Sequence, residues 1–333
     1  MISGSDRPSP SRPTPRSGPG AFRTSRKDGD RRPEGNPVAG AASPARRPAF
    51  GIGRPRTVRF LPVVLVFLIA ACARVPEAPH KPVVAVSVLP QAAFVEGIAG
   101  DLVAVQVMIP PGAAEMYEPN MEQLRSLSRA VLYVKVGHPG FPFEAAWLDD
   151  LLAENPGLPV VDASEGVDRK AGDPHVWVSP QCVRVMARNI AAALVERFPE
   201  DGERFRTGLE EFLLEVDEVD RDLRRMLGPF RGREILVFHP AWGYLAEEYG
   251  LVQVAVEHGH KEPGAKQLAD LIKHARETGT RVIFAQPQVS RAHAEALAAE
   301  IGAEVVIVDP LARDWAENLR RTGEAFRRAL GEE

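Results

Sequence analysis

Eight short apolar runs constrain the fold of this chain more than any other feature. They cover residues 83–88, 103–109, 131–136 and 159–163, and then 234–238, 252–256, 281–285 and 304–309. Most of their residues are apolar and many are β-branched, which is typical of strands that are buried on both faces of a parallel sheet. Because helical stretches alternate with the runs, the sequence predicts an α/β protein whose two lobes each hold a largely parallel four-stranded sheet flanked by helices.

A long helix is predicted between the two sets of runs. From residue 203 to 227, apolar residues recur at spacings of three and four, interrupted only by Gly208. At 1.5 Å per residue, this segment would span about 37 Å. We therefore expect one rigid helix at 203–228 to join an N-terminal lobe at 82–202 to a C-terminal lobe at 229–333.

The residues before the first run resemble export signals more than folded structure. Residues 1–56 are rich in Pro, Gly, Ser and Arg without apolar periodicity, so we expect them to be disordered. Residues 57–71 hold a short apolar run that follows several arginines, as in signal peptides, and the letters IAAC resemble the lipobox of bacterial lipoproteins. That resemblance implies cleavage before Cys72, a lipid on Cys72 and a linker at 72–81. The alternative is a buried apolar strand that happens to contain a cysteine. A signal so far along the chain also suggests that translation begins nearer Val58.

Charge and cysteine content narrow the class of protein. Residues 1–59 carry a net charge of +9, so residues 60–333 carry −13. An acidic body argues against a nucleic-acid or anionic-membrane surface and suits a protein that handles cations. With Cys72 lipidated, Cys182 is the remaining cysteine, so no internal disulfide is expected and Cys182 should simply be packed.

Acidic and imidazole side chains follow several of the predicted strands. In open α/β sheets, ligands bind beyond the carboxyl ends of the strands. The candidates at those positions are Glu115 and Glu118 after the second run, His175 after the fourth, His239 after the fifth and Asp309 at the end of the eighth. Since both lobes contribute, the sequence predicts a metal site in a cleft between them. Each residue also has an ordinary alternative: Asp309 as a helix N-cap, the histidines as packed core residues, the glutamates as solvated loop residues.

The motifs around three of these positions resemble a known family. The chain reads DPHVWVSP around His175, VFHPAWGY around His239 and IVDPLA around Asp309. From about Pro82 to Leu330 it resembles the periplasmic or lipid-anchored metal-binding receptors of zinc and manganese ABC importers. That resemblance implies two α/β lobes joined by one long helix, and four metal ligands: Glu115, His175, His239 and Asp309.

The first ligand loop departs from the family pattern. Aligned on its YEP letters, PPGAAEMYEP carries Glu115 where most members carry histidine, and the loop is one residue shorter. Glu118, His138 or water could fill that position instead. The long histidine-rich loop of many zinc receptors is absent, and His258 and His260 could gather metal or lie in an ordinary surface turn.

The expected function is an extracytoplasmic, lipid-anchored receptor that is not an enzyme and acts as a monomer. It would bind Zn(II) or Mn(II) and deliver the ion to the membrane permease of an ABC importer. Two imidazoles with two carboxylates would balance the charge of a divalent ion, and this mixture of ligands suits zinc while tolerating manganese. A metal-dependent hydrolase and a surface adhesin on the same scaffold are the alternatives, although the HExxH motif is absent.

Overall fold

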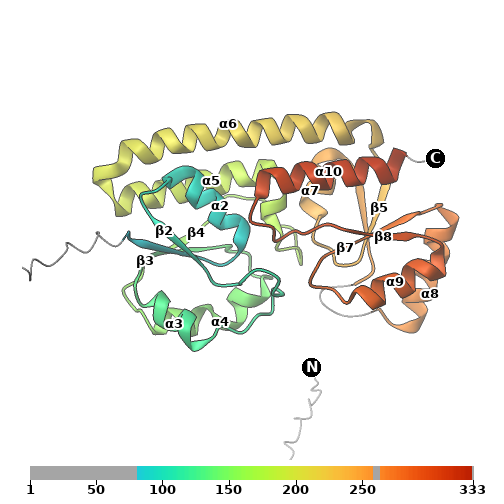
Figure 1. The fold of residues 1–333 in the computed structure, drawn as a ribbon, viewed down its shortest axis with the longest axis horizontal. Coiled ribbons are helices and arrows are strands. Elements are labelled where there is room, and N and C mark those ends of the chain that lie inside the picture. Colours follow the sequence, from blue (N-terminus) through green and yellow to red (C-terminus); the bar gives the residue numbers. More distant parts are fainter. Residues whose placement is uncertain (1–80, 258–262, 332–333) are drawn as a thin grey trace, which may run out of the picture. The chain divides into compact units, whose positions relative to one another are not determined.

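The computed structural model describes residues 81–257 and 263–331, all of which belong to one compact unit (Figure 1). The signal-like segment, Cys72, His258 and His260 lie outside the described residues. Among the residues that are described, no helix is both long enough and apolar enough to cross a bilayer.

The N-terminal sheet has the strand order β2-β1-β3-β4, and every pair of neighbours is parallel. Its strands are β1 (Val83–Val86), β2 (Ala104–Val107), β3 (Ala130–Lys135) and β4 (Val160–Asp162). Helices α2 (Leu89–Ala99), α5 (Pro180–Arg197) and α6 (Gly202–Leu227) cover one face, and α3 (Met121–Leu127) and α4 (Pro142–Ala153) lie on the other (Figure 1).

The C-terminal sheet repeats this order as β6-β5-β7-β8, again with parallel pairs throughout. Its strands are β5 (Glu234–Val237), β6 (Val252–Ala255), β7 (Val282–Ala285) and β8 (Glu304–Ile307). Helices α7 (Gly243–Tyr249) and α10 (Trp315–Gly331) lie on the side of α6, while α8 (Ala265–Glu277) and α9 (Arg291–Ile301) lie on the opposite side (Figure 1). The predicted fold class is therefore confirmed.

Helix α6 is the long connector that the sequence predicts, and it runs along both lobes (Figure 1). Its buried apolar residues recur every three or four positions and include Phe205, Phe212, Val216, Val219 and Leu223. Close packing explains its internal glycine, because a Cβ on Gly208 would lie 2.1 Å from the backbone oxygen of Ile98 in α2. The helix therefore packs tightly on α2 along its first half.

One hydrophobic core extends across both lobes on the side of α6. The ring of Trp315, at the start of α10, lies 5.5 Å from that of Phe94 in α2. The Trp177 indole N–H donates to the Pro310 carbonyl at 2.7 Å, and the Trp315 indole N–H donates to the Trp177 carbonyl at 2.7 Å. A smaller, separate cluster lies between the C-terminal sheet and α8 and α9. The lobes thus share a packed interface as well as a connecting helix.

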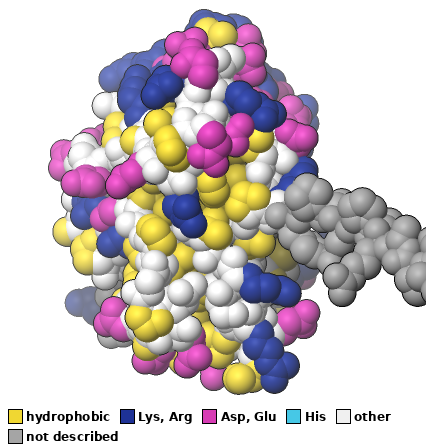
Figure 2. Space-filling view, turned by 90° about the vertical axis from the view of Figure 1, so that its left-hand side faces the viewer, with side chains coloured by type: hydrophobic (Ala, Val, Ile, Leu, Met, Phe, Trp, Pro, Cys, Tyr) yellow, Lys and Arg dark blue, Asp and Glu magenta, His cyan; other side chains and the backbone are white. Residues whose placement is uncertain are grey.

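The surface of the N-terminal lobe carries mixed charge. Figure 2 shows Lys and Arg interspersed with Asp and Glu on the face at the left of Figure 1, with apolar side chains between them. That face does not offer the continuous basic surface that a nucleic acid would need.

Candidate metal site

Three of the four predicted ligands come together. Glu115, His175 and His239 each offer one ligand atom, and the three atoms all lie within 4.8 Å of one another. All three side chains are buried, with Glu115 and His175 coming from the N-terminal lobe and His239 from the C-terminal lobe. Among the described residues, this is the group of acidic, imidazole and thiol side chains whose spacing suits a metal ion.

Strand ends bring these residues to one place. Glu115 lies in the loop that follows β2, His175 follows β4 and directly precedes the short 3₁₀ turn Val176–Val178, and His239 lies two residues after β5. In parallel sheets the carboxyl ends of the strands share one edge, and the loops that leave that edge form the binding surface. The two sheets face the cluster through this edge.

His175 is held by a carboxylate on each ring nitrogen. Nδ1 lies 2.7 Å from Asp173 Oδ1, and Nε2 lies 2.9 Å from Glu115 Oε1. The same Asp173 oxygen also accepts the backbone N–H of His175 at 3.0 Å. The carboxylate of Asp173 therefore fixes both the backbone and the ring, and directs Nε2 toward Glu115.

His239 has a carboxylate partner of its own. Its Nδ1 lies 2.9 Å from Oε2 of Glu257, which lies two residues after β6. A carboxylate on one ring nitrogen of a histidine fixes the tautomer and leaves the other nitrogen to bind a metal. Each lobe therefore presents one imidazole that is oriented by an acid.

The charge around His175 is arranged for a cation. Burial lowers the pKa of His175, but the Glu115 and Asp173 carboxylates outweigh burial and raise the pKa to about 10. Since ionised carboxylates only accept hydrogen bonds, both ring nitrogens carry protons in the metal-free protein. A metal ion that binds Nε2 must displace the proton between His175 and Glu115.

Asp309 lies close to a strand end, as predicted, but outside the group of three. Its Oδ1 accepts the backbone N–H of Leu311 at 3.0 Å and lies 3.4 Å from Nε2 of Gln288. A carboxylate can accept such a bond through one oxygen and coordinate a metal through the other, so capping the turn does not exclude a ligand role. Its place in the metal shell stays a prediction.

The alternatives to Glu115 lie elsewhere. Glu118 is exposed. His138 is buried, accepts the Gly140 N–H on Nδ1 at 3.0 Å and places Nε2 3.0 Å from the Lys170 carbonyl. Because a backbone N–H can only donate, Nε2 must carry the ring proton, and His138 holds its loop together rather than facing the site.

Cys182 is a packed residue of α5, as expected. Burial raises the pKa of its thiol to about 11, which makes it a poor nucleophile and metal ligand at neutral pH.

Two functional residues escaped the sequence reasoning. Asp173 stands two positions before His175, and an acid so close to a predicted ligand could have indicated that it orients the ligand. Glu257 orients His239 from the loop that follows β6, and no local pattern links the two positions.

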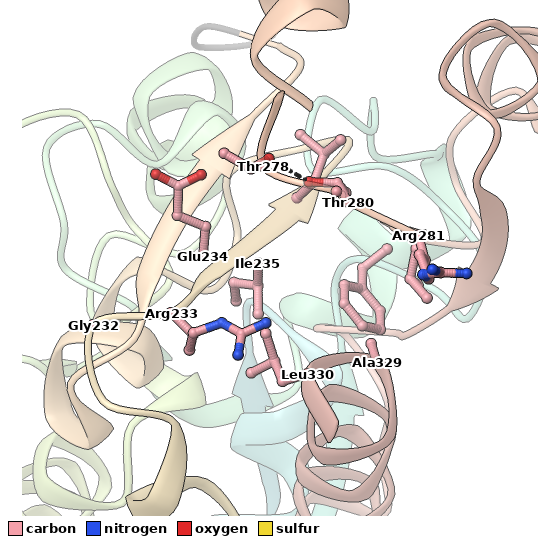
Figure 3. Close-up of a pocket in the computed structure, with 13 residues that line it drawn as sticks. Gly232, Arg233, Glu234, Ile235, Thr278, Thr280, Arg281, Ala329 and Leu330 are labelled. Atoms are coloured by element: carbon pink, nitrogen blue, oxygen red, sulfur yellow. Dashed lines mark hydrogen bonds between the residues drawn. The ribbon is translucent and has the colours of Figure 1, made fainter. Parts of the chain in front are cut away.

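A separate pocket lies at the opposite edge of the C-terminal sheet (Figure 3). It measures about 320 Å³, is formed by the amino ends of β5 and β7, and is closed by the end of α10 at Ala329 and Leu330. On one side of the pocket, the hydroxyl groups of Thr278 and Thr280 form a hydrogen bond, with their oxygens 3.0 Å apart (Figure 3). None of the predicted ligands lines this pocket.

Two parallel sheets bridged by one long helix, with a buried acid–imidazole cluster where the lobes meet, define a two-lobed α/β protein whose clustered side chains could hold a metal ion. Residues 84–329 match the family model described as zinc-uptake complex component A, periplasmic. The chain belongs to this family.

Comparisons with individual proteins agree with this family assignment. The chain is 31% identical over 172 residues to the high-affinity zinc uptake system protein ZnuA of Bacillus subtilis, covering 45% of this chain and 54% of that relative. It is 25% identical over 279 residues to the zinc-binding lipoprotein AdcA of Streptococcus pneumoniae, covering 78% of this chain and 55% of AdcA. A crystal structure of ZnuA superposes with a TM-score of 0.72 at 38% identity, covering 75% of this chain and 99% of that one. The chain thus spans about half the length of these two curated relatives.

Proposed function

We propose that the protein is an extracytoplasmic receptor that binds zinc, and tolerates manganese, through Glu115, His175 and His239. It would pass the ion to the permease of an ABC importer. The observation that carries this proposal is the buried cluster in which three ligand atoms from two lobes lie within 4.8 Å of one another. The zinc-uptake relatives support the choice of metal.

The donor set suits a divalent ion that must be held and later released. Two imidazoles and a carboxylate match zinc, and Asp309 would close a four-coordinate shell without an open water position. A closed shell favours binding over catalysis, since a metallohydrolase needs an open position and a general base. The proposed role is therefore a receptor and not an enzyme.

The direct test is the metal content of protein purified without added metal, followed by a competitive titration with zinc and manganese. We expect one ion per chain, with zinc bound more tightly. His175→Ala and His239→Ala should each weaken zinc binding by orders of magnitude while the metal-free protein stays folded. Unchanged zinc affinity in both variants would overturn the proposal, whereas a folded protein that takes up no divalent metal would favour an adhesin.

Anchoring to a membrane through Cys72 is part of the proposal. The lipobox-like letters before Cys72 support it, as does a relative that is a lipoprotein. Intact-mass measurement of the membrane fraction should find a lipidated chain that begins at Cys72. After detergent extraction, this chain should elute as a monomer in size-exclusion chromatography. A chain that still carries residues 1–71 would contradict this expectation.

A further inference from the structure

The carboxylate that orients His175 also contacts the other lobe. Asp173 Oδ1 binds the backbone and ring of His175, so only Oδ2 remains to face outward. A Cβ placed on Gly243, the first residue of α7, would lie 2.3 Å from Asp173 Oδ2 and 3.5 Å from its Cγ. Asp173 therefore sits against the bare backbone of the C-terminal lobe at a distance that only glycine permits.

Backbone conformation does not explain this glycine. Gly243 is not among the glycines with positive φ, so an L-residue could adopt its backbone angles. Alanine is also the better helix former, and Gly243 begins a helix. The close approach of Asp173 is what excludes a side chain here.

The backbone at Gly243 cannot easily move away from Asp173. Gln253 in β6 accepts the Trp242 N–H at 2.7 Å, and its Nε2 lies 3.4 Å from the same Cβ position. Trp242 is buried, with its ring 5.8 Å from that of Phe326 in α10. A methyl group on Gly243 would therefore push on Asp173, whose short side chain carries the displacement to the His175 ring.

We propose that Gly243 is a positioning residue of the metal site, which admits Asp173 so that contact between the lobes sets the orientation of His175. This inference rests on the proposed metal-binding function. It makes the affinity of an N-terminal-lobe ligand depend on a C-terminal-lobe residue that offers no ligand atom of its own.

The test is a double-mutant cycle read by zinc titration. Gly243→Ala should weaken zinc binding at least about tenfold, the range seen when partners of metal ligands are lost. Asp173→Ala should weaken it by a similar factor. In the double variant the clash is gone, so its affinity should equal that of Asp173→Ala alone. The ring-nitrogen NMR signals of His175 should shift in Gly243→Ala.

Two glycine variants serve as controls. Gly97→Ala places a Cβ 2.6 Å from the Phe212 ring, away from the metal site, so it should lower the melting temperature without changing zinc affinity. Gly228→Ala meets nothing within 4 Å and should change neither. Together the two controls distinguish the effect of a steric clash anywhere in the fold from the effect of a clash with Asp173.

The outcomes distinguish this inference from the proposed function. If the wild-type protein binds no zinc, the proposed function fails. If the wild type binds zinc and Gly243→Ala binds it equally well, only the positioning role is wrong. The same holds if the double variant loses zinc affinity by the product of the two single-variant factors. Should Gly243→Ala not fold, the double variant must fold and bind as Asp173→Ala does; an unfolded double variant would also overturn the inference.

Discussion

Glu115 is the residue whose identity most affects the choice of metal. It lies 2.9 Å from His175 in the buried cluster, at the position where the family pattern places histidine. If Glu115 is a ligand, Glu115→Ala should cost as much zinc affinity as His175→Ala. Glu115→His should raise the preference for zinc over manganese, because it adds a third imidazole. Competitive titration of both metals measures these changes.

The matched control for Glu115 is Glu118→Ala, three residues further along the same loop. Its side chain is exposed and lies outside the cluster, so zinc affinity should stay that of the wild type. Equal losses in Glu115→Ala and Glu118→Ala would mean that the loop as a whole, and not Glu115, supports binding.

Zinc binding should release a proton from His175. The pKa of His175 in the folded protein is raised to about 10 from an ordinary 6.5, so the ring is charged at pH 7. This raised pKa stabilises the metal-free fold fully below about pH 6.5, and the stabilisation is lost as the pH rises through about 10. Zinc competes with the proton on Nε2, so affinity should rise with pH. Calorimetry at pH 7 in buffers of different ionisation enthalpy should find about one proton released.

His175→Ala is the control for proton release. The zinc binding that remains in His175→Ala should release markedly less than one proton per ion. A wild-type titration that is independent of buffer would show that His175 is neutral in the metal-free protein.

The cluster was largely predictable at the residue scale, but not its full set of partners. The strand-end rule pointed to Glu115, Glu118, His175 and His239, because parallel strands deliver their carboxyl ends to one edge, and the family resemblance then selected Glu115 over Glu118. For Asp309 the rule does not distinguish two roles, because a turn cap and a metal ligand both require an aspartate at this position. Gly243 carries no chemical signal at all, since its role depends on a contact between residues 70 positions apart.

At the scale of elements, Asp220 joins three helices beneath the lobe interface. Its carboxylate accepts hydrogen bonds from Arg184 of α5 at 2.8 Å and Tyr249 of α7 at 3.0 Å, and pairs with Arg224 of its own helix α6 at 2.9 Å. Burial raises the pKa of Asp220, but the bonds from Arg184 and Tyr249 outweigh it and hold the pKa below its usual range. The ionised carboxylate therefore stabilises the contact between the three helices.

Asp220→Asn should lower the free energy of unfolding by about 2 kcal/mol at pH 7. A depressed pKa in the folded state stabilises the protein above the unfolded pKa near 3.8, and this stabilisation is lost as the pH falls through the lower folded value. The difference between variant and wild type should therefore shrink in acid. Urea unfolding at pH 7 and pH 3.5 measures it.

Asp217→Asn is the matched control for Asp220. Asp217 also pairs with Arg184, at 2.8 Å, but its side chain is 46% exposed, so its loss should cost well under 1 kcal/mol. A larger loss from Asp217 than from Asp220 would mean that the exposed pair carries the contact.

The order of the elements could be predicted because most strand residues are apolar and α6 repeats its apolar residues at a helical period. Two features were beyond the pattern. The sequence does not reveal that α10 returns to the N-terminal lobe, where Trp315 meets Phe94, because that contact joins residues more than 200 positions apart. Nor does it reveal the Trp177–Pro310 hydrogen bond, which requires both lobes in place.

At the scale of the whole molecule, the shared core should restrict how far the lobes can move. Helix α6 spans both lobes, and buried residues of both belong to one cluster. We therefore expect zinc to cause small lobe shifts and local ordering of loops rather than a wide hinge closure. Solution scattering with and without zinc should give nearly the same radius of gyration. Marked compaction on zinc binding would contradict this expectation.

The central claim is that one ion is held by Glu115, His175 and His239 where the two lobes meet. A crystal structure of the zinc-loaded protein tests it most directly. The account predicts a single zinc ion bound by Nε2 of each histidine and by a Glu115 oxygen, at about 2.0–2.2 Å, with Asp173 and Glu257 still on the two Nδ1 atoms. Zinc bound elsewhere, with Nε2 of His175 still bonded to Glu115, would contradict the account.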